Sequence, residues 1–268
     1  MQLQKQLIHT PPHFLTVQED ACQLNADRCR RLFIENHLSA AGNILVERSN
    51  FHVRIADTQS VQRQVGALID RMHAWRGYRQ EASEIRAPLD QTTLQACDGR
   101  DTLGTLTLNI DSKNGLLADE LYRREVDVLR KRGATVCELT GLAVSAQFGS
   151  SELLATLFHL LHIVGRRLHH ATDAVIEINP RHSLYYQRFL GFRQIGERKI
   201  CGRVKAPAVL LHIETDFVEE QISRYAGQHK KSGRSLYPYF FSRRETDLIS
   251  QRILGMGRRL PASPDARS

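Results

Sequence analysis

The sequence predicts an α/β (α+β) fold in which a mixed, twisted β-sheet is flanked by helices. The main observation is a strand, helix, strand order in the middle of the chain: residues 136–144 form an apolar strand, an amphipathic helix follows, and residues 174–178 form a second strand. Two strands joined by a crossover helix run parallel. Alternating apolar and polar residues on either side of this unit add antiparallel strands, so the sheet is predicted to be mixed.

The segments before the central unit have the patterns of a strand, a helix, a hairpin and a second helix. Residues 51–55 alternate as a half-buried strand, and apolar residues keep helical spacing over 61–75. Residues 80–91 are polar and predict a loop, and 92–111 predict a hairpin. A helix is then predicted over 119–131.

Two further strands are predicted after the central unit. A short aromatic helix follows Asn179-Pro180, and residues 193–203 and 208–214 then have strand patterns. These two strands are expected to complete an antiparallel half beside the parallel pair.

The length of 268 residues suits one large domain with appendages. We predict an N-terminal extension over residues 1–50, containing a helix at 20–37, a core over 51–216, and a basic C-terminal extension over 217–268.

Composition excludes several classes of protein. The sequence has no apolar run of 18 residues and no signal-peptide core, which predicts a cytoplasmic protein. Its five cysteines are odd in number and lack paired spacing, so reduced thiols are expected. Cys22 and Cys29 match no zinc-binding spacing, and no metal site is predicted.

Glu138 is a single carboxylate in an otherwise apolar strand. Strict alternation places Glu138, Thr140, Leu142 and Val144 on one face of that strand. One interpretation is a buried glutamate satisfied by a nearby arginine or backbone amide. The other is a general base whose pKa is raised by its apolar surroundings, suited to taking a proton from an amine.

The turn after this strand has the features of a phosphate-binding helix N-terminus. Ser150 or Ser151 suits the N-cap position, and Glu152 suits the first turn. Plain helix capping explains these residues. The added hypothesis is that exposed amides hold a phosphate group. The residues concerned are Gln147, Phe148, Gly149, Ser150 and Ser151.

Longer motifs resemble a known enzyme superfamily. The strand, turn, helix and strand, followed by an Asn, a Tyr and a Gly-Phe pair, resemble the core of the GCN5-related N-acyltransferases (GNAT). The resemblance to the long-chain N-acyl amino acid synthases, relatives of the acyl-homoserine-lactone synthases, is closer and covers about residues 51–216. The motifs that carry it are Gly115 to Leu121, Glu125 to Arg130, Glu138 to Val144, Asn179-Pro180-Arg181-His182, Tyr185-Tyr186 and Leu190-Gly191-Phe192.

The resemblance implies transfer of a long-chain acyl group from acyl carrier protein, or from coenzyme A, to the amino group of an amino acid. Glu138 would be the base, and backbone amides at Ala143, Val144 and Ser145 would stabilise the oxyanion. Tyr186, or alternatively Tyr185, would protonate the leaving thiolate. No tightly bound cofactor is implied.

The resemblance also implies which residues bind the substrates. Asn179, Arg181 and His182 would contact the pantetheine arm or the acceptor, with structural capping as the alternative for Asn179. Trp75, Tyr78 and Thr140 are candidates for the acceptor pocket, although the spacing of Trp75 and Tyr78 also suits core positions.

Two positions depart from the family pattern. Gln147 is followed by Phe-Gly-Ser-Ser rather than by the glycine-rich loop that cradles a pyrophosphate. A carrier protein presents only one phosphate on its pantetheine arm, so the shorter loop favours that donor. Gly141 stands where relatives often have arginine, which weakens the likeness to acyl-homoserine-lactone synthases.

Basic residues are concentrated on the predicted helix at 119–131 and in the tail. On the helix, they form either a solvated face or a docking face for an acidic carrier protein. These residues are Arg123, Arg124, Arg130, Lys131 and Arg132.

The tail mixes aromatic and basic residues. Residues 221–268 contain ten basic and three acidic residues, against 37 and 29 in the whole chain. One interpretation is a linker followed by a short helix over 245–254 that packs on the core. Another is contact with a membrane surface. No nucleic-acid-binding motif accompanies the charge, so no nucleic-acid partner is expected.

Three other functions remain open from the sequence. They are an acetyl-CoA-dependent N-acetyltransferase, an acyl-homoserine-lactone synthase and a non-catalytic acyl-binding module.

Overall fold

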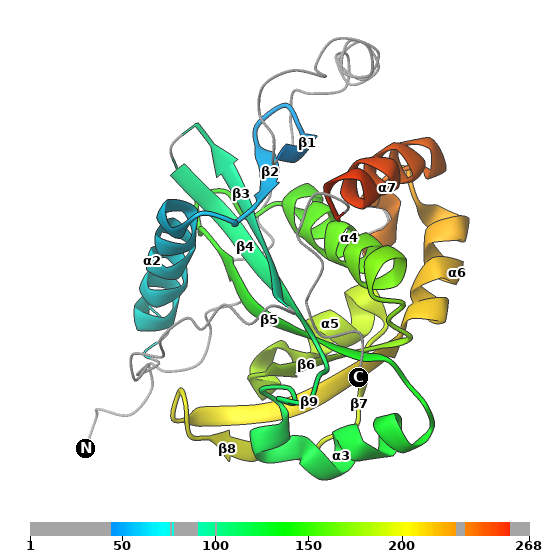
Figure 1. Ribbon diagram of the computed structural model, residues 1–268. Helices are drawn as coiled ribbons and strands as arrows, with labels where there is room; N and C mark the ends of the chain where they lie inside the picture. The colour runs from blue at the N-terminus through cyan, green and yellow to red at the C-terminus, as the bar shows by residue number, and fades with distance from the viewer. Residues whose placement is uncertain (1–43, 76, 78–90, 100, 229–233, 258–268) are drawn as a thin grey trace, which may run out of the picture.

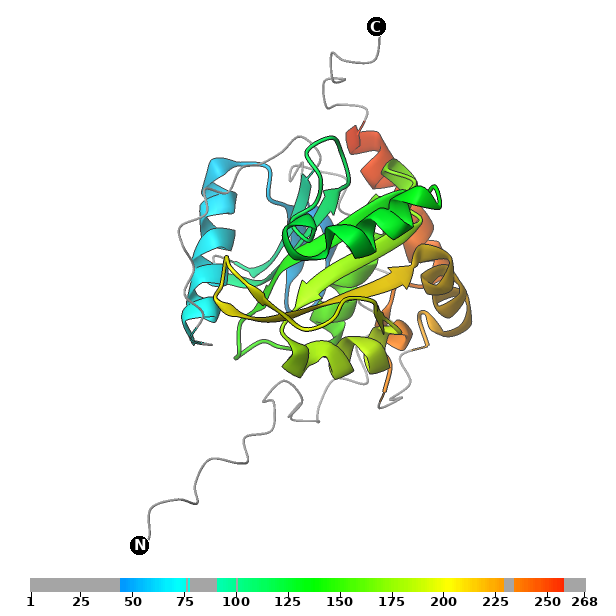
Figure 2. The same cartoon turned by 90° about the horizontal axis from the view of Figure 1, so that it is seen from below.

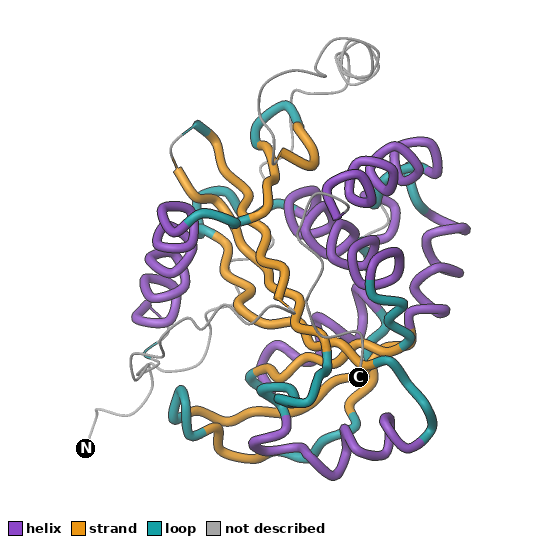
Figure 3. Tube along the Cα trace, viewed as in Figure 1, coloured by secondary structure: helices purple, strands orange, loops and turns teal. Residues whose placement is uncertain are grey.

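The computed structural model describes residues 44–75, 77, 91–99, 101–228 and 234–257. Within them, nine strands form one sheet in the order β1-β2-β3-β4-β5-β6-β9-β7, with β8 also paired to β9 (Figures 1 and 3). The strands are β1 (Ile44–Glu47), β2 (His52–Ile55), β3 (Gln91–Asp98), β4 (Asp101–Ile110), β5 (Val136–Val144), β6 (Asp173–Ile178), β7 (Arg193–Gln194), β8 (Lys199–Cys201) and β9 (Ala206–Glu214).

Some predicted features lie outside the described residues. They are the helix at 20–37, Cys22, Cys29, Tyr78 and residues 80–90 of the predicted loop.

The sheet is mixed, which confirms the predicted fold class. Strands β1 to β5 are antiparallel neighbours, β5 and β6 are parallel, and β6 and β9 are again antiparallel. The crossover between β5 and β6 is α4 (Ser151–Leu168), whose N-cap is Ser150. The Ser150 hydroxyl accepts a hydrogen bond from the Leu153 N–H at 3.0 Å, as the sequence predicts.

Helices cover both faces of the sheet. The other helices are α2 (Gln59–Trp75), α3 (Asp119–Lys131), η1 (Pro180–His182), α5 (Ser183–Leu190), α6 (Thr215–Tyr225), η2 (Tyr237–Tyr239) and α7 (Arg243–Gly257). Helices α4 to α7 enclose the main core on one face, whereas α2 and α3 pack on the other. Helix α2 and the pair α6 and α7 lie at opposite sides of the molecule in both views (Figures 1 and 2). Among the described helices, none combines the length and apolar character that crossing a bilayer requires.

A β-bulge at Gly141 changes which side chains share a face in β5. Between the β4 pairs of Thr140 and Ala143, β5 has one residue more than β4. Gly141 adopts a φ of 61°, a left-handed conformation that glycine tolerates best. The extra residue reverses the alternation, so that Val144 packs in the core with α4 and Ala143 packs against α2. The predicted alternation holds up to Thr140 and is wrong for residues 142–144.

The strand predicted over 193–203 is interrupted. Its two ends, β7 and β8, both pair with β9. Between them, the Ile195 and Gly196 N–H groups donate to the same carbonyl oxygen, that of Leu210. A Cβ at Gly196 would lie 2.6 Å from the Tyr122 ring, so the chain approaches α3 too closely there for any other residue.

The aromatic part of the tail belongs to the hydrophobic core. Tyr237, Phe240 and Phe241 are buried, and the Tyr237 hydroxyl donates to the Leu190 carbonyl oxygen at 2.7 Å. The rings of Phe240 and Phe241 stack on the buried His159 of α4, with centroids 4.7 and 4.9 Å away. Because these rings are buried, they are not available to the predicted membrane-surface contact. The predicted short helix is confirmed as α7.

The burial of Phe240 predicts that the tail contributes to global stability. Phe240 is 2% exposed, so Phe240→Ala should lower the free energy of unfolding by about 3 to 5 kcal/mol, because it removes a buried ring and leaves a cavity. Urea unfolding measures this loss. Leu248→Ala, at a side chain of α7 that is 45% exposed, is the control and should have a much smaller effect. Equal midpoints for Phe240→Ala and the native chain would contradict this role.

Candidate active site

Glu138 lies where the two parallel strands stop pairing. Strands β5 and β6 pair up to Leu139 and Ile176, although β5 continues to Val144 and β6 to Ile178. We call these unpaired carboxyl ends the strand opening. In α/β sheets, ligands bind at the carboxyl ends of neighbouring parallel strands.

The Glu138 carboxyl group is buried and only partly satisfied. Its side chain is 1% exposed, and Oε2 accepts a hydrogen bond from the Leu117 N–H at 2.7 Å. Oε1 is buried and has no hydrogen-bond partner among the described residues. Burial raises the pKa of Glu138 to about 7, although the Leu117 and Ala118 N–H groups oppose the rise. The carboxyl therefore exchanges a proton near neutral pH.

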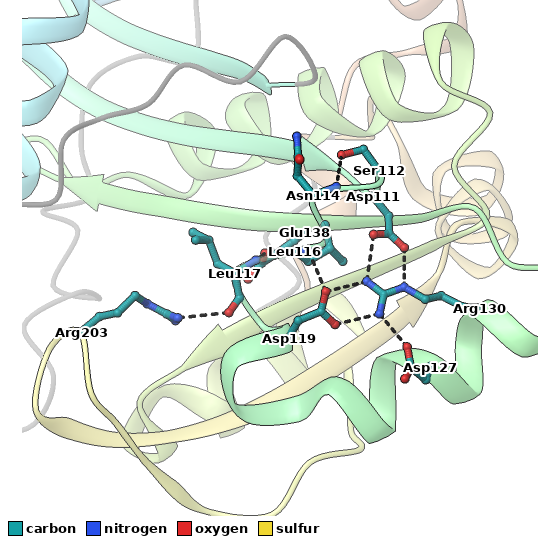
Figure 4. A network of polar contacts seen from close by, with 10 residues as sticks. All are labelled: Asp111, Ser112, Asn114, Leu116, Leu117, Asp119, Asp127, Arg130, Glu138 and Arg203. Atoms are coloured by element: carbon teal, nitrogen blue, oxygen red, sulfur yellow. Dashed lines mark hydrogen bonds and ion pairs between the residues drawn. The ribbon is translucent and has the colours of Figure 1, made fainter. Parts of the chain in front are cut away.

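A fork of ion pairs fixes the loop that contacts Glu138. The Arg130 guanidinium binds Asp111, at the end of β4, and Asp119, at the start of α3, through contacts of 2.7 to 2.9 Å. Asp119 also accepts a hydrogen bond from the Leu116 N–H at 2.8 Å. Figure 4 shows the loop between Arg130 on one side and Arg203 on the other. Arg130 thereby positions the Leu117 N–H over Glu138.

Arg203 links the same loop to a second glutamate. Its guanidinium donates to the Leu117 carbonyl oxygen at 3.1 Å and to Glu177 of β6 at 2.7 Å. It also pairs with Glu120 of α3. The Glu177 side chain is 9% exposed. The negative charge of Glu177 contributes to the raised pKa of Glu138, and the positive charge of Arg203 opposes this rise.

Only part of the predicted oxyanion site remains available. The Ser145 N–H donates to the Leu103 carbonyl oxygen at 2.8 Å. Residues of an antiparallel strand direct their N–H groups alternately toward and away from the partner strand. The Val144 N–H therefore points away from β4, toward the strand opening, whereas that of Ala143 points toward β4.

The turn before α4 is exposed around Gln147 and Phe148. The Phe148 N–H donates to the Ser145 carbonyl oxygen at 3.0 Å, so this amide is used within the turn. Gly149, Ser150 and Ser151 lie at the helix N-terminus, where the first amides have no partner within the helix. These three residues are the part of the turn that suits a single phosphate.

The loop after β6 is structured by its own side chains. The Asn179 side chain accepts a hydrogen bond from the Arg181 N–H at 3.1 Å and caps η1. The Arg181 Nε lies 3.1 Å from the His182 Nε2. Capping therefore occupies Asn179 and leaves the exposed Arg181 as the cation of this loop.

The two candidate tyrosines of α5 lie on the α4 side of the sheet, opposite Glu138. Tyr186 is buried and makes edge-to-face contacts with Phe158 and Phe192. Tyr185 stacks on Phe189 with a centroid separation of 4.6 Å, and burial raises the pKa of its hydroxyl.

Two of the three acceptor-pocket candidates, Trp75 and Thr140, lie within the described residues. Trp75 is 67% exposed at the end of α2, so the interpretation as a core residue is wrong. The Thr140 hydroxyl accepts a hydrogen bond from Asn109 of β4 at 2.9 Å. Asn109 was not predicted from the sequence, and neither were Arg203 and Glu177. The sequence could have indicated Glu177, because it is a carboxylate within an apolar strand, as Glu138 is.

The family model of the N-acyl amino acid synthase FeeM matches residues 64–214. The solved structure of FeeM, an N-acyl amino acid synthase from uncultured soil microbes, is similar with a TM-score of 0.58 and 24% sequence identity, covering 62% of this chain and 92% of that chain. The likeness shows a shared fold. The residues that the family model matches include Glu138, Glu177 and the strand opening but not α6, η2 or α7.

Two other solved structures are less similar. A CoA-dependent acyl-homoserine lactone synthase, MesI, has a TM-score of 0.45 and 16% identity, covering 62% of this chain and 88% of that chain. An acyl-CoA N-acyltransferase from Pseudomonas aeruginosa has a TM-score of 0.44 and 17% identity, covering 60% and 97%. A search of curated protein sequences gave no match.

The raised pKa of Glu138 predicts a pH-dependent stability. Because the pKa rises from its ordinary 4.5 to about 7, the folded protein keeps a proton that the unfolded chain releases between these pH values. Glu138 therefore makes the folded state less stable as pH rises through this window. Glu138→Gln cannot ionise, so its unfolding free energy relative to the native chain should increase by about 3 kcal/mol from pH 4.5 to pH 8.

Urea unfolding at a series of pH values measures this difference. Glu220→Gln, which removes an exposed carboxylate of α6, is the matched control. A difference between Glu138→Gln and the native chain that stays constant across the series would contradict a raised pKa.

Proposed function

Because the chain belongs to the N-acyl amino acid synthase FeeM family, and is therefore an N-acyltransferase, we propose that it moves a long-chain acyl group from acyl carrier protein to the amino group of an amino acid. The observation that supports this most strongly is Glu138. It is a buried carboxyl group with a pKa of about 7 and one oxygen without a donor among the described residues, and it lies where β5 and β6 stop pairing.

Glu138 supplies the base that the reaction needs. An amino acid enters as an ammonium, which has no lone pair and cannot attack a thioester. The Glu138 carboxylate removes one proton, directly or through a water molecule. With a pKa of about 7, this group is ionised in roughly half of the molecules at neutral pH and holds the proton it receives.

The freed amine then attacks the thioester carbonyl. An amide C–N bond forms, the carbonyl oxygen becomes an oxyanion, and the Val144 N–H faces the position where that charge develops. The C–S bond breaks, a tyrosine hydroxyl protonates the leaving thiolate, and the nitrogen releases its second proton through water to the tyrosinate that remains. Tyr186 is the first candidate and Tyr185 the alternative. Because the tyrosines and Glu138 lie on opposite sides of the sheet, a thioester held in the strand opening has the acid on one side and the base on the other.

Two features favour acyl carrier protein as the donor. The turn before α4 retains amides at residues 149–151, which suit the single phosphate of a pantetheine arm. On α3, Arg123, Arg124 and Lys131 are exposed and have no ion pair among the described residues, whereas Arg130 and the C-cap residue Arg132 are paired with aspartates. The three exposed cations form the face that we assign to docking of the acidic carrier.

The reaction predicts new lipids in a host that expresses the chain. Mass spectrometry of lipid extracts should detect N-acyl amino acids with the native chain, and their masses identify the acyl chain and the acceptor. Glu138→Gln should lower the yield by about a hundredfold or more, because the ammonium keeps its proton. Glu220→Gln on α6 is the control. An undiminished yield from Glu138→Gln would contradict the base assignment, and a soluble native chain that gives no product would contradict the function.

The choice of donor predicts a selective effect of charge reversal on α3. The double substitution Arg123→Glu and Arg124→Glu should raise the KM for acyl carrier protein about tenfold, because it removes electrostatic attraction, and should leave the KM for acyl-CoA unchanged. The effect should shrink as salt is added. The same reversal at Arg243 and Arg244, exposed on α7, is the control. Equal effects on both donors would contradict docking on this face.

A further inference from the structure

Glu138 and Glu177 are held by the same two residues, Leu117 and Arg203. The Leu117 N–H donates to Glu138 Oε2 at 2.7 Å, and the Leu117 carbonyl oxygen accepts from Arg203 at 3.1 Å. Arg203 then donates to Glu177 Oε1 at 2.7 Å. One residue of the loop before α3 and one arginine thus hold one oxygen of each carboxyl group.

The other oxygen of each group has no strong donor among the described residues. Glu138 Oε1 and Glu177 Oε2 are both buried and accept no hydrogen bond from an N–H or O–H group there, and the thiol of Cys201, a weak donor, is the further neighbour of the Glu177 carboxyl group. Buried polar groups are nearly always hydrogen-bonded, so two acceptor oxygens that border the same opening are able to bind a donor group of a substrate.

The strand register places these two groups on the same face of the sheet. Glu138 pairs with Val175 of β6, and Glu177 is two residues further along that strand, which returns it to the face of Val175. The two carboxyl groups are close enough for the charge of Glu177 to act on Glu138. Glu177 also follows Ile176, the last residue of β6 that pairs with β5, so it borders the strand opening.

A small cation with several N–H donors suits these two acceptor oxygens. Two carboxyl groups repel each other when both are ionised, and a cation between them removes that repulsion. Among the described residues, no group of three or more His, Cys, Asp or Glu side chains is placed to hold a metal ion. A primary ammonium has three donors and one positive charge, which matches two acceptor oxygens.

We propose that Glu177 is the second acid of the acceptor site, and that Glu138 Oε1 and Glu177 Oε2 together bind the ammonium of the amino acid, directly or through one water molecule. This inference rests on the proposed function. Glu138 takes the proton, and Glu177 remains the charged partner that keeps the nitrogen in place. Arg203 acts as a positioning residue, because it holds Glu177 Oε1 and leaves Oε2 for the ligand.

The acceptor KM tests this assignment. Glu177→Gln should raise the KM for the amino acid at least tenfold at pH 7. The KM for the acyl donor should not change, because of the two substrates only the amino acid contacts Glu177. Glu125→Gln on α3 is the matched control. Among the described residues, Glu125 also has a buried Oε2 without a donor and an ion-paired Oε1. Its partner, however, is Lys199 rather than Arg203. An unchanged acceptor KM in a folded Glu177→Gln protein would overturn the proposal.

A second measurement needs no acyl transfer. Methylammonium chloride should raise the melting temperature of the native chain, whereas tetramethylammonium chloride, which has the charge but no N–H donor, should not. Glu177→Gln should abolish the methylammonium effect and Glu125→Gln should keep it. An effect that is absent from the native chain, or equal in Glu177→Gln, would overturn the proposal. A chain that binds methylammonium in this way but makes no N-acyl amino acid would retain the cation site and lose the proposed function.

Discussion

The Arg130 guanidinium is the contact on which the candidate site depends. It joins the end of β4 to the start of α3, because it binds both Asp111 and Asp119. Asp119 in turn holds the loop whose next amide contacts Glu138. Because a planar guanidinium binds carboxylates in fixed, two-point geometry, this fork orients the loop more strictly than a single lysine contact does.

Burial of Glu138 opposes folding and suits its proposed role as a base for the same reason. An apolar setting disfavours the charged carboxylate, which raises the pKa and lowers the stability of the folded state at neutral pH. The same shift brings the group to the pH at which it can take a proton from an ammonium. Glu177 strengthens the shift and Arg203 moderates it, so the three groups set one value together. Perturbed pKa values of this kind, which cost stability, are concentrated at functional sites.

The C-terminal segment completes the face of the sheet opposite this site. Helices α6 and α7 lie beyond the residues that match the family model, yet Phe240, Phe241 and Ile253 are part of the main core. The segments that contain these residues pack on α4, the helix that follows the turn at residues 147–151 and connects β5 to β6. The described part of the segment therefore supports the helix from which the proposed phosphate-binding amides project.

Local sequence patterns determined the strands, the helices and the singular position of Glu138. Periodicity and capping depend on neighbours along the chain, so the 136–178 unit, the hairpin and the Ser150 cap were predictable. Only the tertiary structure decided which groups meet. One extra residue at Gly141 reversed the faces of β5, because alternation has a period of two and a single insertion inverts it. Arg203 reaches Glu177 and Leu117 across 26 and 86 residues. Contacts of this kind depend on how β8 and α3 pack beside the sheet, which no local pattern encodes.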